Sequence, residues 1–257
     1  MSSPVQTSFA DYIFEIKISI NDQNTFNLNA FAALDRALDE ASATAGLRVL
    51  ILSSASPEFF SFGLDPHAIH GASTEDLSQI LEYFFKVLKK IYLFPVPVIA
   101  SIGGHALGYG AMLASMCDFR LLVDKGVRMS FPEMNIGITL PAFVTIRLTD
   151  LVGERAVRDF LFSSFAPKPP EALAVGLVDE LVEKEKLADR TRSFAKRLSG
   201  LPREAVRKQK EILRNQYGRN FDAIVSMDKK NTLEFFEKDE PREGFASMVE
   251  KRRPVFK

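Results

Sequence analysis

Hydrophobic residues follow two different spacings in the first 140 residues of the chain. They alternate with polar residues over 12–20, and short apolar runs stand at 49–52 and 98–102, patterns typical of half-buried and buried strands. Between these segments, apolar residues recur at helical spacing up to a stop at Gly46, and again from a capping residue at Ser73 to a pair of prolines. Strands that alternate with helices predict βαβ units and a layered α/β core.

The pattern changes around two segments. Residues 59–71 show neither spacing and predict an irregular loop, and beyond Pro141 the strand signals fade. Helices are predicted at 141–151, 153–163, 170–175, 186–199 and 203–217, followed by an amphipathic helix that carries apolar residues from Phe221 to Phe236. These late helices are rich in large apolar residues and have no sheet partners, so we expect a helical appendage that packs on another subunit.

The centre of the chain is the stretch from Pro97 to Glu133. An apolar strand is followed by a glycine-rich turn at 103–110, a short helix of small residues at 111–117 and another strand at 118–123. Because a helix leaves its first backbone N–H groups without intrahelical partners, and its dipole is positive at that end, this turn predicts a site for negative charge. A phosphate, a carboxylate or an oxyanion formed during a reaction would each fit there.

Composition narrows the class of protein. A chain of 257 residues can bury a large core, and its 33 basic and 33 acidic residues cancel, so nothing in the net charge favours nucleic acid or an acidic membrane as a partner. No apolar run approaches the roughly 20 residues that span a bilayer. The single cysteine, Cys117, cannot form an internal disulfide, and the N-terminus has no signal-peptide or transit-peptide pattern, so we expect a cytoplasmic protein.

The sequence does not match several familiar motifs of cofactor-binding, metal-binding and nucleophilic sites. The glycines at 108 and 110 are followed by Leu113 where a dinucleotide fingerprint needs a third glycine, and neither a P-loop nor a nucleophile elbow occurs. His67 and His70 have the spacing of some metal ligands, but no cysteine or acidic cluster stands near them, so we expect loop histidines and no metal. Cys117 follows an apolar helix, which predicts a buried thiol and not a nucleophile.

Glu133 is the candidate for acid–base chemistry. It lies in the mostly apolar segment 129–137, just after a strand-like segment. A carboxyl group in such surroundings would have a raised pKa, because desolvation disfavours the charged form, and a raised pKa suits a general base that works near neutrality. The alternative is an exposed glutamate at a strand end, and the residues alone leave both interpretations open.

Segments spread over the chain resemble a known family. The motifs PVIA, GHALGYG and CDFR, which lie in order within 97–120, resemble the central signature of the crotonase superfamily, the enoyl-CoA hydratases and isomerases. Residues 60–65 resemble the earlier loop of this family, and residues 172–179 and the tail 252–256 also fit. The resemblance runs in order over nearly the whole chain.

The resemblance implies an α/β fold, a crotonase-like spiral of ββα units with a C-terminal helical region used for trimerisation. The chain would then divide into a core at 1–198 and an oligomerisation region at 199–257. The resemblance also implies acyl-CoA thioester substrates, with CoA as part of the substrate and no separate cofactor. It implies a homotrimer or a dimer of trimers.

The resemblance further assigns an oxyanion hole to the backbone N–H groups of Leu64 and Tyr109, which would hold the thioester oxygen as it becomes an enolate. Tyr109 lies at the predicted helix N-terminus, where fixed N–H donors favour developing negative charge. The loop from Ser61 to Asp65 would contact the CoA adenine through its backbone. The implied substrate-binding residues are Ser61, Phe62, Gly63, Leu64, Asp65, Tyr109, Gly110 and Met112.

The acid–base residues distinguish the reactions within the superfamily. The hydratases of this family use two glutamates, and the matching positions here hold Met112 and Glu133. Methionine cannot transfer a proton, whereas one carboxylate suffices to move a proton from C2 to C4 of a 3-enoyl-CoA. We therefore expect a Δ3,Δ2-enoyl-CoA isomerase of fatty acid metabolism, a branch that Leu64 after Gly63 also resembles.

The chain also departs from the family pattern. Tyr109 and Phe62 replace smaller residues that are more usual in relatives, and Gly103-Gly104 stands where relatives often have Asn-Gly. A pocket modified in this way leaves open a hydratase and another enolate chemistry, such as hydrolysis or decarboxylation. It also leaves open a catalytically silent protein that binds CoA esters.

Overall fold

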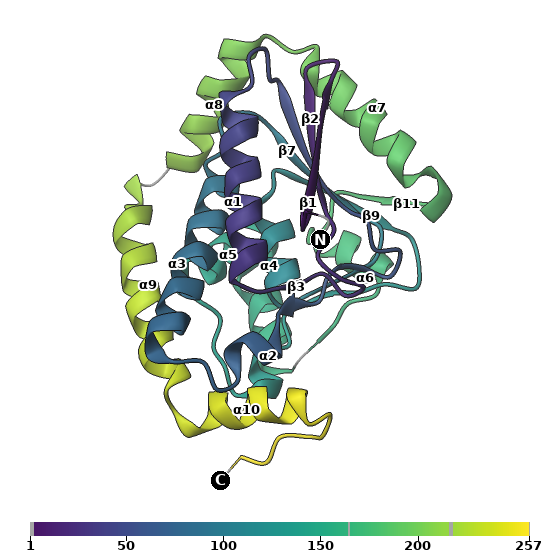
Figure 1. Cartoon of the computed structure of the whole chain (residues 1–257). Coiled ribbons are helices and arrows are strands. Elements are labelled where there is room, and N and C mark those ends of the chain that lie inside the picture. Colours follow the sequence, from purple (N-terminus) through teal and green to yellow (C-terminus); the bar gives the residue numbers. More distant parts are fainter. Residues whose placement is uncertain (1–2, 164, 216–217, 257) are drawn as a thin grey trace.

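The main sheet has six strands in the described part of the chain. The computed structural model describes residues 3–163, 165–215 and 218–256 (Figure 1). In sheet order the strands are β1 (Val5–Ala10), β2 (Ile13–Ile18), β4 (Val49–Ser54), β7 (Val98–Ile102), β9 (Phe119–Val123) and β11 (Glu180–Val182). Strand β1 runs antiparallel to β2, and every other neighbouring pair is parallel.

Shorter strands form two further sheets. One has the order β10 (Met129–Ser130), β8 (His105–Leu107), β5 (Phe59–Ser61), and the other pairs β3 (Thr25–Phe26) with β6 (Gly63–Leu64). The chain leaves the main sheet, adds a strand to a smaller sheet and then forms a helix, as in the sequence of β7, β8 and α4 (Tyr109–Met116). This repeated path confirms the predicted α/β fold, a spiral of ββα units.

Helices cover the main sheet. Helix α1 (Leu28–Ala43) packs on α3 (Thr74–Tyr92), while α7 (Leu187–Ser199) packs on β4, β7 and β9, and Figure 1 shows the sheet between α1 and α7. Ser73 caps α3 as predicted, because its hydroxyl accepts a hydrogen bond from the Asp76 N–H. The remaining helices are α2 (Pro66–Ile69), α5 (Ala142–Phe162), α6 (Pro169–Ala174), α8 (Arg203–Asn215), α9 (Phe221–Phe236) and α10 (Asp239–Val249), with 3₁₀ turns η1 (Glu133–Ile136) and η2 (Lys184–Lys186).

Two predictions are wrong. The expected irregular loop at 59–71 contains β5, β6 and α2, and the region after Pro141 contributes β11, which pairs with β9. Each of these elements has two to four residues, too few for a hydrophobic period to appear in the sequence. Strand β1 and helix α10 were not predicted either; β1 exposes every residue except Val5, so it shows no alternation.

The helices predicted for the second half are confirmed. Gly153, with a φ of 78°, divides α5 where the sequence predicts a break between 151 and 153. Helix α8 matches the segment predicted at 203–217, of which residues 216–217 lie outside the described residues. In the parts of the chain that the structure describes, no helix is long and apolar enough to cross a membrane.

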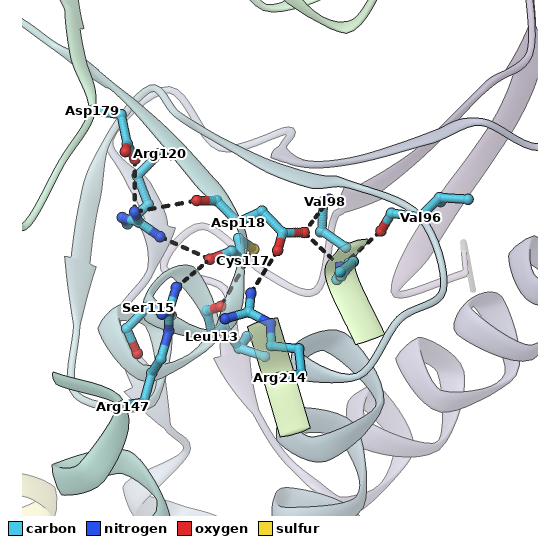
Figure 2. Close-up of polar contacts among 11 residues, drawn as sticks. Val96, Val98, Leu113, Ser115, Cys117, Asp118, Arg120, Arg147, Asp179 and Arg214 are labelled. Carbon is cyan, nitrogen blue, oxygen red and sulfur yellow. Dashed lines mark hydrogen bonds and ion pairs between the residues drawn. The ribbon is translucent and has the colours of Figure 1, made fainter. Parts of the chain in front are cut away.

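A buried ionic cluster fastens α8 to the core (Figure 2). The carboxylate of Asp118 accepts hydrogen bonds from Lys210 Nζ at 2.5 Å, from Arg214 Nη2 at 2.6 Å and from the Val98 N–H at 2.8 Å. Two of these donors lie on α8 and the third lies on β7. The CDFR motif therefore has a structural role, since it ties the C-terminal helices to the central β7–α4–β9 unit.

Two arginines beside this cluster cap the C-terminus of α4. Arg147 donates to the carbonyl oxygens of Ser115 and Cys117 at 2.8 and 2.9 Å, and Arg120 donates to Cys117 at 2.8 Å (Figure 2). Guanidinium groups stabilise this end of a helix because its dipole is negative there. Cys117 is buried, as predicted, and burial raises the pKa of its thiol to about 12, which makes it a poor nucleophile.

Asp228 on α9 caps α5 from a distance. Its buried carboxylate accepts hydrogen bonds from the N–H groups of Ala142 and Phe143 at 2.9 and 2.7 Å. We expect Asp228→Ala to lower the free energy of unfolding by about 1–2 kcal/mol, since it removes a helix cap. Urea denaturation measures this, with Glu234→Ala on the exposed side of α9 as the control, and equal stability of the two variants would contradict the capping role.

Candidate active site

A cavity of about 360 Å³ lies at the N-terminus of α4. Its walls come from the segment around β6, from α3 and α4, from the turn η1 and from α9 and α10. Most of the lining side chains are apolar, among them Leu81 and Phe84 of α3 and Phe236 of α9. Concave apolar cavities with a few polar groups are typical of sites for small molecules and cofactors.

Glu133 supplies the ionisable group of this cavity. Strand β10 leads through Pro132 into η1, which begins at Glu133 and ends at Gly137 in the left-handed conformation. The Glu133 side chain is 3% exposed, and its Oε2 atom has no hydrogen-bond partner among the described residues. Burial raises the pKa of this carboxyl group to about 8. The predicted desolvation is therefore confirmed, and the alternative of an exposed glutamate is wrong.

Two glycines bring the backbone of β6 and the start of α4 together. Gly63 has a φ of 121°, and a Cβ atom there would lie 3.3 Å from the Tyr109 backbone nitrogen. Gly108 has a φ of 51°, and a Cβ atom there would lie 3.5 Å from Glu133 Oε1. Because both positions lack side chains, the Tyr109 amide, the strand that carries Leu64 and the Glu133 carboxyl group border one space.

The Tyr109 ring is buried in an aromatic cluster. It is 1% exposed and lies among Phe26, Phe31 and Phe84, with ring-centroid distances of 5.2, 5.0 and 4.5 Å. Its hydroxyl donates a hydrogen bond to the Phe84 carbonyl oxygen at 3.2 Å. The large side chain thus anchors the first residue of α4 in the core. Its N–H, the first of the helix, has no acceptor within α4.

Met112 lies one helical turn beyond Tyr109 and is 4% exposed. It lines the cavity together with Glu133, as do Phe62, Gly63 and Leu64. Among the described residues that line the cavity, Glu133 is the one carboxylic acid. At Met112, the position that the resemblance assigns to a second glutamate in hydratases, the lining therefore has an apolar thioether.

Three predicted site residues lie behind the lining. The Ser61 hydroxyl donates to the Asn24 carbonyl oxygen at 2.7 Å, and Asp65 caps α2 by accepting from the His67 N–H at 3.0 Å. A Cβ atom on Gly110 would overlap the Ser61 carbonyl oxygen, so this glycine lets α4 approach β5 closely. Their contact with substrate stays a prediction. Within the described ranges, no group of three His, Cys, Asp or Glu side chains is arranged to hold a metal ion.

The C-terminal helices contribute lining residues that the sequence analysis missed. Thr232 and Phe236 of α9 and Phe245 and Met248 of α10 line the cavity of their own chain. An apolar face at helical spacing looks the same in a sequence whether it covers a cavity or another subunit. The division of the chain into a core at 1–198 and an oligomerisation region at 199–257 therefore leaves out one role of the second part.

Fold and cavity together define a class of protein, a ββα spiral with an apolar pocket at the N-terminus of its central helix. Residues 9–257 match the family model described as enoyl-CoA hydratase/isomerase. The chain belongs to this family, which places it among the acyl-CoA enzymes of the crotonase superfamily.

Individual relatives support the assignment. A probable enoyl-CoA hydratase of Bacillus subtilis is 29% identical over 237 residues, which cover 91% of each chain. A short-chain-enoyl-CoA hydratase of Clostridium acetobutylicum is 26% identical over 90% of this chain and 88% of its own. The solved structure of human mitochondrial delta3-delta2-enoyl-CoA isomerase superposes with a TM-score of 0.90 at 23% identity, covering 96% of this chain and 97% of that one; this likeness concerns the fold alone.

Proposed function

We propose that the protein is a Δ3,Δ2-enoyl-CoA isomerase, which moves the double bond of a 3-enoyl-CoA thioester to the 2 position. The observation that supports this proposal most is the single carboxylic acid in the described lining of the cavity, Glu133, which shares that lining with Met112. Moving a double bond needs one group that takes a proton and returns it elsewhere. Adding water needs a base for the water and an acid for the carbon.

The proposed reaction has two proton transfers. The Glu133 carboxylate removes a proton from C2 of the 3-enoyl thioester, and the electrons move to the thioester oxygen to give a dienolate. The N–H groups of Leu64 and Tyr109 stabilise this negative charge. The same carboxyl group then delivers the proton to C4, which leaves the double bond between C2 and C3. A pKa of about 8 favours both transfers near neutrality.

A substrate panel tests the reaction type. We expect the wild-type protein to isomerise short and medium 3-enoyl-CoA esters and to hydrate the 2-enoyl esters at least about 100-fold more slowly, since the second acid–base group is missing. Both rates are measured from the products by chromatography. Equally fast hydration would favour the alternative that the names of the relatives support, a hydratase. Tight binding of acetoacetyl-CoA without any turnover would favour a silent binding protein.

We also propose a homotrimer or a dimer of trimers built on the region after residue 199. Ile212 and Leu213 on α8 are 52% and 54% exposed, neighbouring large apolar side chains that a partner subunit would cover. We expect light scattering to give about three or six times the chain mass of 28.7 kDa, and Ile212→Glu to shift the protein toward monomers, with Lys208→Gln on the same helix as the control. A monomer at micromolar concentration would refute the proposal.

A further inference from the structure

Helix α10 touches both halves of the candidate active site. It packs against α2, which directly follows the strand carrying Leu64, and against η1, which carries Glu133. It also supplies Phe245 and Met248 to the wall of the cavity. A shift of α10 would therefore move the oxyanion side and the acid–base side relative to each other.

The contact between α10 and η1 is made by backbone at the C-terminal end of the turn, where Ile136 is followed by Gly137. A Cβ atom on Gly244 of α10 would overlap the carbonyl oxygen of Ile136. At the next residue, a Cβ atom on Gly137 would lie 2.9 Å from the Glu240 carbonyl oxygen and 2.9 Å from Cε1 of Phe256. Glycines at both positions allow this close approach, and the Phe256 ring covers the end of η1.

A latch on α10 holds Phe256 in this place. The Glu243 carboxylate accepts hydrogen bonds from the Val255 N–H at 2.7 Å and from Arg252 Nη2 at 2.8 Å, and Arg252 also pairs with Glu250. The Arg252 N–H donates to the Ser247 carbonyl oxygen at 3.0 Å. Arg252 and the Val255 N–H lower the pKa of Glu243 to about 2, so the latch stays ionised at every pH at which an enzyme of this kind works.

We propose that α10 and the tail 252–256 act as a clamp that positions the Glu133 turn against the Leu64 strand and keeps water away from the Glu133 carboxyl group. Phe256 and Glu243 are then positioning residues, and the tail motif has a role at the active site. The expected effect of the clamp on turnover rests on the proposed function, because it requires Glu133 to be the base. Its effect on the surroundings of Glu133 does not depend on which reaction the protein catalyses.

Desolvation controls the ionisation of Glu133, because no charged side chain faces it from the packed elements that the structure describes. The lining residues contributed by α3, α9 and α10 are uncharged, and α4 contributes Tyr109, whose hydroxyl is bound to the Phe84 carbonyl oxygen. Glu240 and Glu243 of α10 and Arg252 of the tail are outside the lining. Water admitted by a loosened clamp would therefore stabilise the carboxylate and lower its pKa.

The test compares tail variants of the full chain. Phe256→Ala removes the ring that covers Gly137, and Glu243→Gln weakens the latch. The matched controls are Val255→Ala in the same tail and Glu234→Gln on the exposed side of α9. Titration of carboxyl-labelled glutamate by ¹³C NMR follows Glu133 directly, with its signal assigned by its loss in Glu133→Gln. Thermal unfolding shows that each variant remains folded.

We expect the titration midpoint of Glu133 to fall by at least about one pH unit in Phe256→Ala and Glu243→Gln and to stay unchanged in both controls. Turnover should fall by at least about tenfold, with KM within about threefold, because substrate contacts remain while the base is misplaced. An unchanged midpoint in folded Phe256→Ala, or a wild-type midpoint near that of free glutamate, would overturn the clamp. If the midpoint shifts and Glu133→Gln is nevertheless active, the clamp is supported and the proposed isomerase reaction is contradicted.

Discussion

Glu133→Gln is expected to lower the turnover of a 3-enoyl-CoA by about 10²–10⁴-fold, the range typical of general acid–base catalysis. Glutamine keeps the size of the side chain and some of its hydrogen-bonding capacity but cannot accept and return a proton. The apolar cavity and the Leu64 and Tyr109 amides are untouched, so binding of acyl-CoA should change little. Steady-state kinetics gives turnover, and calorimetry with acetoacetyl-CoA gives binding.

The matched control is Glu185→Gln, an exposed glutamate outside the cavity lining that should keep wild-type rates. The pH profile gives an independent check, since a single base with a pKa of about 8 predicts that kcat/KM of the wild type rises with pH through that value. A Glu133→Gln protein that turns over 3-enoyl-CoA at near wild-type rate would remove the base from the proposed mechanism.

The sequence predicts the spiral core well because its long elements carry clear periods. The apolar run at 98–102 is β7, the capping signal at Ser73 starts α3, and the break near 152 is the left-handed Gly153. The strands of the smaller sheets have two or three residues each and depend on partners far along the chain, as β10 does on β8. Such strands are stabilised by tertiary pairing, which a local pattern does not record.

The candidate site, like the fold, could be predicted from the sequence only in part. Apolar neighbours indicated a desolvated carboxyl group at Glu133 but left an exposed glutamate open, and the glycine turn placed the following helix at 111–117, two residues later than α4 begins. The direction of the Tyr109 ring was left open, because it depends on Phe26 and Phe31, which belong to an earlier unit of the spiral. The contribution of α10 was missed, since only the fold brings residues after 239 against η1.

The buried carboxyl group also predicts how stability depends on pH. The pKa of Glu133 is raised from its ordinary value of 4.5 to about 8 in the folded protein. Between these two values the folded state keeps the proton that the unfolded state has lost, so the contribution of Glu133 to stability is present below pH 4.5 and is lost as the pH rises toward 8.

Each pH unit in this window should lower the free energy of unfolding of the wild type by about 1.4 kcal/mol relative to that of Glu133→Gln. Over the whole window the decrease should be about 3–5 kcal/mol. Glutamine stays neutral at every pH, while the variant keeps all other titrating groups, including the half-buried His105. Urea denaturation of both proteins from pH 5 to pH 9 therefore isolates the effect of one carboxyl group, and Glu133→Gln should become the more stable protein toward pH 8. A stability difference that stays constant across the range would mean that Glu133 ionises as freely in the folded protein as in the unfolded chain. It could then not have the dry surroundings on which both the proposed base and the proposed clamp depend.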